Sequence, residues 1–296
     1  MTKFRVGLAQ LESRLGEADY DPRPANLERA DQAVGEAKWL GADLVLLGEM
    51  FLTGCRSDEH NLTYALRIDQ DDPALQAVVD LAARHGVHLV MGSATIRDTD
   101  PETVHNSALL VAPDGLMASY DKTHLAYVTE PNGTLHDETA WFGAGAELPV
   151  WPTASFGVLG PQICYDNHFA EVGRAQTVLG AESLLNISAS AAGFEEIWFH
   201  LRAARAIENA AWFVNCSVVG EQKGERYFGR SAVVDPMGRL VVEAADGVED
   251  IVVADIDLDQ ARAVRAMMNT LGSRRPDVYG SIVDRRTVAR AEGETR

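Results

Sequence analysis

The sequence predicts an α/β fold in which helices cover β-sheets of mixed strand direction. Short runs rich in Val, Leu and Ile, typical of strands covered on both faces, recur along the chain. Segments with helical periodicity separate many of them, which indicates layers of sheet and helix. Two turn sequences, Asp114-Gly115 and Pro236-Met237-Gly238, lie between neighbouring apolar runs, as in β-hairpins. Parallel and antiparallel pairing should therefore occur together.

Strands are expected at ten short apolar runs, because runs of this length bounded by turn residues are typical of buried strands. In chain order these runs are Phe4–Leu11, Asp43–Gly48, Val87–Ala94, Ser107–Ala112, Phe156–Cys164, Ser183–Ser188, Trp212–Val219, Ser231–Asp235, Leu240–Glu243 and Ile251–Ile256.

Four helices are expected between these strands. The clearest begins at Asp72-Pro73, because Asp is a favoured N-cap and Pro a favoured first helical residue, and it ends near Gly86. The other three carry apolar residues at spacings of three and four, which form one stripe on a helix. The stripes are Leu27, Ala30, Val34, Ala37 and Leu40; Phe169, Val172 and Leu179, with the polar Gln176; and Phe194, Ile197, Leu201, Ala204, Ile207 and Ala211.

The chain of 296 residues shows no internal repeat and no change of composition typical of a linker. We therefore predict a single domain over residues 1–283. Residues 284–296 are rich in Arg and acidic side chains and are expected to form a polar C-terminal tail.

Composition excludes several classes of partner. The net charge of −18 would repel nucleic acids and anionic membranes. No run of about 18 apolar residues suggests a transmembrane helix, and the N-terminus has no signal-peptide core. Three widely spaced cysteines indicate free thiols in a reducing compartment, and no Cys/His pair has zinc-ligand spacing. We expect a cytoplasmic protein without a metal.

Cys164 is the first candidate for chemistry. It ends an apolar run and precedes a predicted helix, where backbone N–H groups and the helix dipole can stabilise a thiolate. The alternative is a small buried hydrophobic residue, as most intracellular cysteines are. That alternative suits Cys216, inside a predicted strand, better. Cys55 follows Gly54 in a loop and could line a site without reacting.

Glu49 and Lys122 are the next candidates. Glu49 ends a buried run, and a carboxylate there is costly unless it is paired or used as a general base. A salt bridge at the rim of the sheet is the alternative. Lys122 follows the first predicted hairpin, where a lysine is usually solvated.

Taken together, these three residues satisfy the needs of one reaction. A thiol nucleophile requires a base for its proton and a cation or N–H groups for the tetrahedral oxyanion. Histidine is the usual base, but His124, His168 and His200 have weak sequence contexts.

Six segments in this order resemble the nitrilase superfamily, the cysteine carbon–nitrogen hydrolases, over residues 3–281. They are Leu46–Gly54, Tyr120–Leu125, Gly160–Asp166, Arg205–Asn209, Phe228–Gly238 and Arg275–Tyr279. The resemblance implies a four-layer α-β-β-α sandwich with mixed sheets, assembled as a homodimer or higher homo-oligomer, and no cofactor.

The resemblance also implies roles for individual residues. Glu49 would activate Cys164, while Lys122 and the backbone N–H of Tyr165 would stabilise the tetrahedral intermediate. Many members have a second active-site glutamate before the cysteine, and Glu138 fits its segment best. Glu130 and Glu147 are rivals for that place.

This chain departs from the usual family pattern in two places. Gly48 stands where proline often precedes the catalytic glutamate, which would loosen the backbone there. After the cysteine, His168 stands where arginine is frequent, so a substrate contact by that arginine is in doubt.

The residues after the cysteine narrow the class of substrate. Tyr165-Asp166 is closer to the amidase and carbamoylase branches than to true nitrilases, so a small amide or N-carbamoyl amine is preferred over a nitrile. Two alternative hypotheses for the function are acyl transfer to an amine and a non-catalytic interaction module. Without an arginine placed to hold a carboxylate, a neutral or cationic substrate is favoured. Residues expected around the substrate are Trp141, Asn167, Ser188, Ala189, Ser190 and Phe194.

Overall fold

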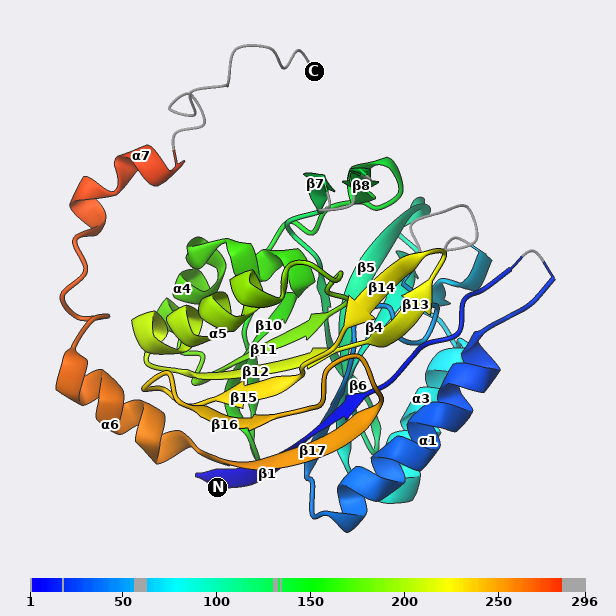
Figure 1. Cartoon of the computed structure of the whole chain (residues 1–296), viewed down its shortest axis with the longest axis horizontal. Coiled ribbons are helices and arrows are strands. Elements are labelled where there is room, and N and C mark those ends of the chain that lie inside the picture. The colour runs from blue at the N-terminus through cyan, green and yellow to red at the C-terminus, as the bar shows by residue number, and fades with distance from the viewer. Residues whose placement is uncertain (1, 18, 56–62, 130–132, 134, 284–296) are drawn as a thin grey trace.

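The computed structural model describes residues 2–17, 19–55, 63–129, 133 and 135–283. Two β-sheets lie face to face, and a pair of helices covers the outer side of each sheet (Figure 1). The chain therefore forms a four-layer α-β-β-α sandwich with mixed sheets, as predicted. Residues 284–296, where a polar tail is expected, lie outside the described residues.

The first sheet has the strand order β17-β1-β2-β4-β5-β6, with β3 paired to β4. Strands β1, β2 and β4 run parallel, whereas β17, β5 and β6 run antiparallel to their neighbours. The bounds are β1 (Lys3–Gln10), β2 (Leu44–Leu47), β3 (Leu66–Arg67), β4 (His88–Arg97), β5 (Asp100–Ala112), β6 (Gly115–Asp121) and β17 (Asp250–Asp257).

The second sheet has the order β16-β15-β12-β11-β10-β9, in which β10, β11 and β12 are parallel. Its strands are β9 (Trp151–Thr153), β10 (Gly157–Ile163), β11 (Ser183–Ser188), β12 (Trp212–Ser217), β15 (Ala232–Val234) and β16 (Leu240–Glu243). Separate hairpins are formed by β7 (Tyr127–Thr129) with β8 (Leu135–Asp137) and by β13 (Val219–Gln222) with β14 (Glu225–Phe228). Both predicted hairpins are confirmed, as the β5–β6 and β15–β16 pairs.

The four predicted helices are confirmed as α1, α3, α4 and α5. The carboxylate of Asp72 accepts from the first N–H groups of α3, and Gly86 ends that helix with a φ of 61°. A C-terminal helix, α6, was not predicted, because only three of its residues, Leu258, Ala261 and Val264, are buried. The helices are α1 (Arg23–Trp39), α3 (Pro73–His85), α4 (Ala170–Val178), α5 (Glu195–Asn209), α6 (Leu258–Met268) and α7 (Gly280–Val283).

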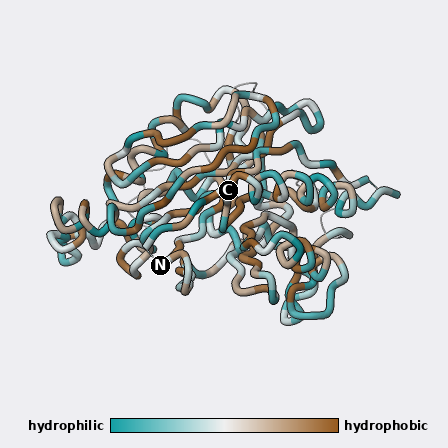
Figure 2. Tube along the Cα trace, turned by 90° about the horizontal axis from the view of Figure 1, so that it is seen from below, coloured by the Kyte–Doolittle hydropathy of each residue, from teal (hydrophilic) through white to brown (hydrophobic). Residues whose placement is uncertain are grey.

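The period-two alternation of strand side chains fills the interfaces between layers. In β2, Leu44 and Leu46 point into the core between the two sheets. Val45 and Leu47 point outwards, into the core beneath α1 and α3. Strands buried on both faces must be apolar throughout, which explains the continuous apolar runs in the sequence. Figure 2 shows such hydrophobic stretches along the strands, with hydrophilic stretches in many of the peripheral loops.

No described helix is both long enough and apolar enough to cross a membrane.

Candidate active site

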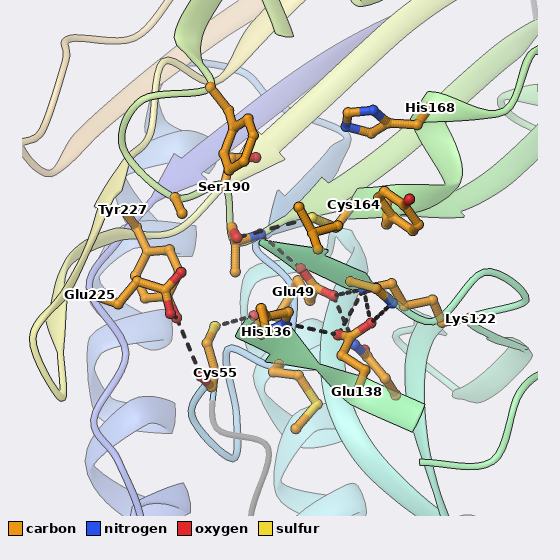
Figure 3. Close-up of a pocket in the computed structure, with 18 of the residues that line it drawn as sticks. Glu49, Cys55, Lys122, His136, Glu138, Cys164, His168, Ser190, Glu225 and Tyr227 are labelled. Atoms are coloured by element: carbon orange, nitrogen blue, oxygen red, sulfur yellow. Dashed lines mark hydrogen bonds and ion pairs between the residues drawn. The ribbon is translucent and has the colours of Figure 1, made fainter. Parts of the chain in front are cut away.

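A cavity of about 320 Å³ lies beside the carboxyl ends of β2, β6 and β10. Much of its wall is apolar, including Met50, Phe142, Ile197 and Trp198. The polar side chains predicted to carry the chemistry gather on one side of it (Figure 3). The cavity is large enough for a small organic molecule and combines apolar walls with a few converging polar groups, as ligand sites do.

Glu49 follows β2 and is held by three donors. Its Oε1 accepts from Lys122 Nζ at 2.8 Å and from Asn106 Nδ2 at 2.7 Å. Its Oε2 accepts from the backbone N–H of Ala189 at 2.8 Å. The carboxylate is almost completely buried, so its orientation is fixed by these bonds. Oε2 carries fewer donors than Oε1 and is therefore the better proton acceptor.

Lys122 lies between two carboxylates. Its Nζ is 2.8 Å from Glu49 Oε1 and 2.8 Å from Glu138, with the lysine side chain only 1% exposed. Burial opposes the charge of Lys122, but the charges of Glu138 and Glu49 outweigh it and raise the pKa well above its usual value. The ammonium is therefore charged at neutral pH.

Glu138 lies in a short 3₁₀ helix, Glu138–Ala140, and is fixed on both oxygens. Oε1 accepts from Lys122, while Oε2 accepts from the backbone N–H of Ala126 at 2.6 Å. Burial opposes its charge, but Lys122, His136 and the Ala126 N–H together lower the pKa of Glu138 to about 2. It is ionised at neutral pH and already saturated with donors, so it holds the lysine rather than exchanging a proton.

Cys164 is the first residue after β10 and lines the cavity. Its φ of 45° lies in the left-handed region, an uncommon conformation for a residue with a side chain. Burial and the charge of Glu49 raise the pKa of its thiol well above the usual value, with Lys122 opposing them. The resting cysteine is thus a protonated thiol, and it requires a base to become a nucleophile.

The structure brings together some, but not all, of the predicted substrate contacts. Tyr165 lines the cavity, as do Ala189, Ser190 and Phe194. The other three predicted residues, Trp141, Asn167 and Ser188, do not line this cavity.

Each of these three residues lies elsewhere for a clear reason. Trp141 is 45% exposed, at the end of the 3₁₀ helix that carries Glu138. Asn167 is fully buried, and its carbonyl accepts from Arg205 Nε at 3.0 Å. Ser188 is also buried, and its carbonyl accepts from the backbone N–H of Glu49 at 3.3 Å. Ser188 therefore supports the Glu49 backbone instead of facing a ligand.

Among the rival glutamates, only Glu138 contacts Lys122 in the part of the chain that is described. Glu147 is exposed, and Glu130 lies outside the described residues. The histidines also separate clearly. His168 lines the cavity, and burial lowers its pKa, whereas the His200 side chain is 75% exposed on α5.

Several residues of the site were not predicted from the sequence. Asn106 in β5 bonds to Glu49, and His136 in β8 lies 3.9 Å from Glu138. Glu225 and Tyr227, both in β14, line the cavity across from Lys122 (Figure 3). The alternation of side chains along a strand does not show which inward-facing residue lines a cavity. The sequence therefore gave no signal for these positions.

The expectation that Gly48 loosens the backbone before Glu49 is wrong. A Cβ at Gly48 would lie 2.5 Å from Val218 Cγ1 and 3.2 Å from the carbonyl oxygen of Ser188. The strand end is therefore packed so closely against the second sheet that only glycine fits.

Cys55 also lines the cavity, and its Sγ donates to the backbone carbonyl of Glu49 at 2.9 Å. Within the described ranges, no three His, Cys, Asp or Glu side chains are grouped as metal ligands would be. The polar cluster is thus a thiol, two carboxylates and an ammonium, a set suited to nucleophilic attack on a carbonyl or nitrile carbon.

Comparison with known proteins gives consistent matches. Residues 5–266 match the family described as carbon-nitrogen hydrolase. The chain is 30% identical to omega-amidase NIT3 of Saccharomyces cerevisiae, over 95% of this chain and 96% of that protein. The crystal structure of Saccharomyces cerevisiae Nit3, a member of branch 10 of the nitrilase superfamily, gives a TM-score of 0.80 at 25% identity and covers 93% of this chain and 97% of that one.

A second solved structure is a glutamate-to-glutamine mutant of an amidase from Nesterenkonia sp. AN1, with the acetamide moiety of fluoroacetamide added covalently at its active-site cysteine. It gives a TM-score of 0.74 at 26% identity and covers 92% of this chain and 97% of that one.

Proposed function

Because the chain belongs to the carbon–nitrogen hydrolase family, we propose that it hydrolyses a small amide or N-carbamoyl amine through a thioester on Cys164. Membership makes it an amidase-like enzyme that acts on C–N bonds other than peptide bonds. The observation that carries the finer proposal is the contact of Lys122 with both Glu49 and Glu138 beside the Cys164 thiol.

In the first step, Oε2 of Glu49 takes the proton of Cys164 as Sγ attacks the carbonyl carbon. The raised pKa of the thiol favours this concerted transfer over a standing thiolate. Two donors on Oε1 and one on Oε2 fix the orientation of the Glu49 carboxylate.

The attack forms a tetrahedral oxyanion, and Lys122 is our candidate to stabilise it. An ammonium has three N–H donors, and among the described residues Glu49 and Glu138 take two of them. The third, together with the backbone N–H of Tyr165, would hold the oxyanion.

The C–N bond then breaks as Glu49 returns its proton to the departing nitrogen, so that ammonia or an amine leaves and a thioester remains. Glu49 next takes a proton from water, whose oxygen attacks the thioester carbon. The product acid leaves, and Sγ of Cys164 regains a proton. The covalent adduct at the active-site cysteine of the Nesterenkonia amidase is in keeping with a nucleophilic thiol.

The charges around the cavity favour a neutral or cationic substrate. Among the described lining residues, Glu49, Glu138 and Glu225 are carboxylates, while Lys122 is the one lysine. An anionic acyl group would enter a region of like charge, whereas an ammonium group would be attracted.

Assembly and location complete the proposal. We expect a homodimer, on the resemblance and because Val178, Leu179 and Ile207 on the outer helix layer are each at least half exposed. Light scattering that finds only monomer at micromolar concentration would remove this part. A cytoplasmic location suits the free thiols of Cys55, Cys164 and Cys216.

The deciding experiment measures ammonia or amine release from a panel of amides, N-carbamoyl amines and nitriles. Wild type should release product from at least one amide or carbamoyl compound, and Cys164→Ala should release none. An acyl–enzyme mass on Cys164 during turnover should appear with the same substrate. Equal rates for wild type and Cys164→Ala would refute hydrolysis at this site. Release from nitriles alone would replace the amide assignment.

A further inference from the structure

A buried carboxylate that the proposed reaction does not use lies two residues after the nucleophile. Asp166 has no exposed surface and belongs to the 3₁₀ helix Cys164–His168. A carboxylate removed from water requires donors on both oxygens. In Asp166 these donors come from the ends of β6 and β10, one strand of each sheet, and from the two residues Thr123 and His124 after β6.

Five contacts hold the two carboxylate oxygens of Asp166. Oδ2 accepts from the hydroxyl of Tyr120 at 2.7 Å and from the backbone N–H of Ile163 at 2.9 Å. Oδ1 accepts from the Thr123 hydroxyl and from the backbone N–H of His124, both at 3.1 Å. His124 Nδ1 also lies 2.9 Å from Oδ1.

On the side of the first sheet, these bonds hold the residues that come before and after Lys122 in the chain. Tyr120 in β6 is two residues before Lys122, and Thr123 is the residue after it. Burial, reinforced by the charge of Asp166, raises the pKa of the Tyr120 hydroxyl, so this group stays protonated and donates. The Lys122 backbone is therefore held from both directions by one carboxylate.

On the side of the second sheet, the same carboxylate encloses the cysteine. The bond from Ile163 N–H to Asp166 closes a tight turn around Cys164, the residue with a φ of 45°. A residue with a side chain keeps such a φ only where its surroundings impose it. The His124 ring, stacked on Phe169 at 3.9 Å between centroids, adds a further cross-link over this turn.

We propose that Asp166 is a positioning residue, which fixes the nucleophile Cys164 relative to the ammonium of Lys122 by anchoring both segments to one carboxylate. The tests that measure kcat rest on the proposed function, whereas the test that measures alkylation of Cys164 does not. Asp166 touches neither the cavity nor the reacting atoms, so it acts through the two residues that it anchors.

Two variants and one control test this role. Asp166→Asn keeps the size but turns an amide N–H towards groups that already donate. Tyr120→Phe removes a single donor and is the milder change. The control is Asp235→Asn, because Asp235 is a buried carboxylate that accepts from the backbone N–H groups of Met237 and Arg239 and does not line the cavity.

In Asp166→Asn, kcat should fall about 100-fold with KM changed by no more than about threefold, because displacement by about 1 Å has this effect on chemistry. Tyr120→Phe should lower kcat about tenfold, the value of one hydrogen bond. Asp235→Asn should lower the Tm without changing kcat by more than about twofold.

A second readout does not depend on any substrate. The rate of Cys164 alkylation by iodoacetamide, followed by mass spectrometry, should fall about tenfold at pH 7 in Asp166→Asn, because Lys122 is less well placed to favour the thiolate. The alkylation rate of Asp166→Asn should also begin to rise at a higher pH than that of wild type. The control should alkylate like wild type.

The outcomes separate cleanly. A folded Asp166→Asn with kcat and alkylation within about threefold of wild type overturns the proposal, and so does an equal loss in Asp235→Asn. If Asp166→Asn does not fold, Tyr120→Phe decides, and wild-type kcat and alkylation in it overturn the proposal. If wild type hydrolyses nothing in the panel, the proposed function fails, while alkylation still tests Asp166.

Discussion

The ammonium of Lys122 lies 2.8 Å from the carboxylate of Glu49, and both side chains are at most 4% exposed. The second carboxylate, Glu138, lies 2.8 Å from the same nitrogen. One cation thus neutralises part of the charge of two anions in a region that water barely reaches. These three groups are stable there only together, because each would be an uncompensated buried charge without the others.

Replacing Lys122 should therefore affect stability as well as activity. Lys122→Met leaves Glu49 and Glu138 buried without their cation, which should lower the free energy of unfolding by about 3–5 kcal/mol. Activity should be lost in the fraction that stays folded. Urea unfolding at pH 7 measures the first effect, and ammonia release measures the second.

Lys3→Met is the matched control, since Lys3 pairs with Asp257 at 3.0 Å but its side chain is 72% exposed. Its unfolding midpoint should stay close to that of wild type, because exposed ion pairs contribute little. Equal destabilisation by both variants would contradict the importance of burial at Lys122.

The ionisation of Glu138 should make stability depend on pH in the acid range. Its pKa is about 2 in the folded protein and 4.5 as the ordinary value, so the folded state binds this proton less readily than the unfolded state. The stabilisation is fully present above pH 4.5 and is lost as the pH falls towards 2.

The check compares wild type with Glu138→Gln by urea unfolding at several pH values. The difference in the free energy of unfolding should be largest near neutral pH and should shrink below pH 4.5. A difference that stays constant down to pH 2 would show that the Glu138 charge does not stabilise the fold.

Gly48 should tolerate no side chain, because its Cβ would meet Val218, the residue that follows β12 of the facing sheet. Gly48→Ala should lower the free energy of unfolding by about 1–3 kcal/mol, the usual effect of overpacking. It should also lower kcat, since the next residue is Glu49. Thermal unfolding and steady-state kinetics measure the two effects.

Gly280→Ala provides the comparison, because a Cβ there meets no atom within 4 Å and the residue lies in α7. It should leave kcat and Tm close to those of wild type. Normal kcat in Gly48→Ala would show that the strand end moves without disturbing the base.

The three thiols should differ in their reaction with iodoacetamide. Cys164 lines the cavity, where the reagent can reach it and the proposed base Glu49 can take its proton, so it should be labelled first. Cys216 is fully buried, and burial raises its pKa to about 12, so it should react last. Cys55 also has a pKa raised by burial, and its Sγ donates to Glu49.

Because the pKa of the Cys164 thiol is raised above 9.0, its labelling rate should keep rising with pH up to at least that value. Peptide mass spectrometry at several pH values follows each thiol separately. Equal labelling of all three in the native protein would count against an active Cys164, and Cys164→Ser should lose the fast phase.

The carboxylate of Glu225 should influence which substrates are accepted. Glu225→Gln should lower kcat/KM for amides with an ammonium group by about tenfold and should affect neutral amides of the same length much less. Competition assays with paired cationic and neutral amides give the ratio directly. An unchanged ratio would remove Glu225 from substrate recognition.

Much of the fold was predictable because its signals are local. The apolar runs, the cap at Asp72 and the glycine at 86 each depend on a few neighbouring residues, and the structure confirms them. The gathering of Glu49, Lys122 and Cys164 was predictable through the resemblance, since each follows the end of a strand.

Other features depended on contacts between segments far apart in the chain. The sequence by itself determined the layered class, the order of the predicted elements and the three candidate catalytic side chains. Only the tertiary structure decided that Glu138 contacts Lys122 while Glu147 is exposed, and that Ser188 supports the Glu49 backbone. Local propensity reflects neighbours in the sequence, whereas burial and partners are set where the two sheets meet.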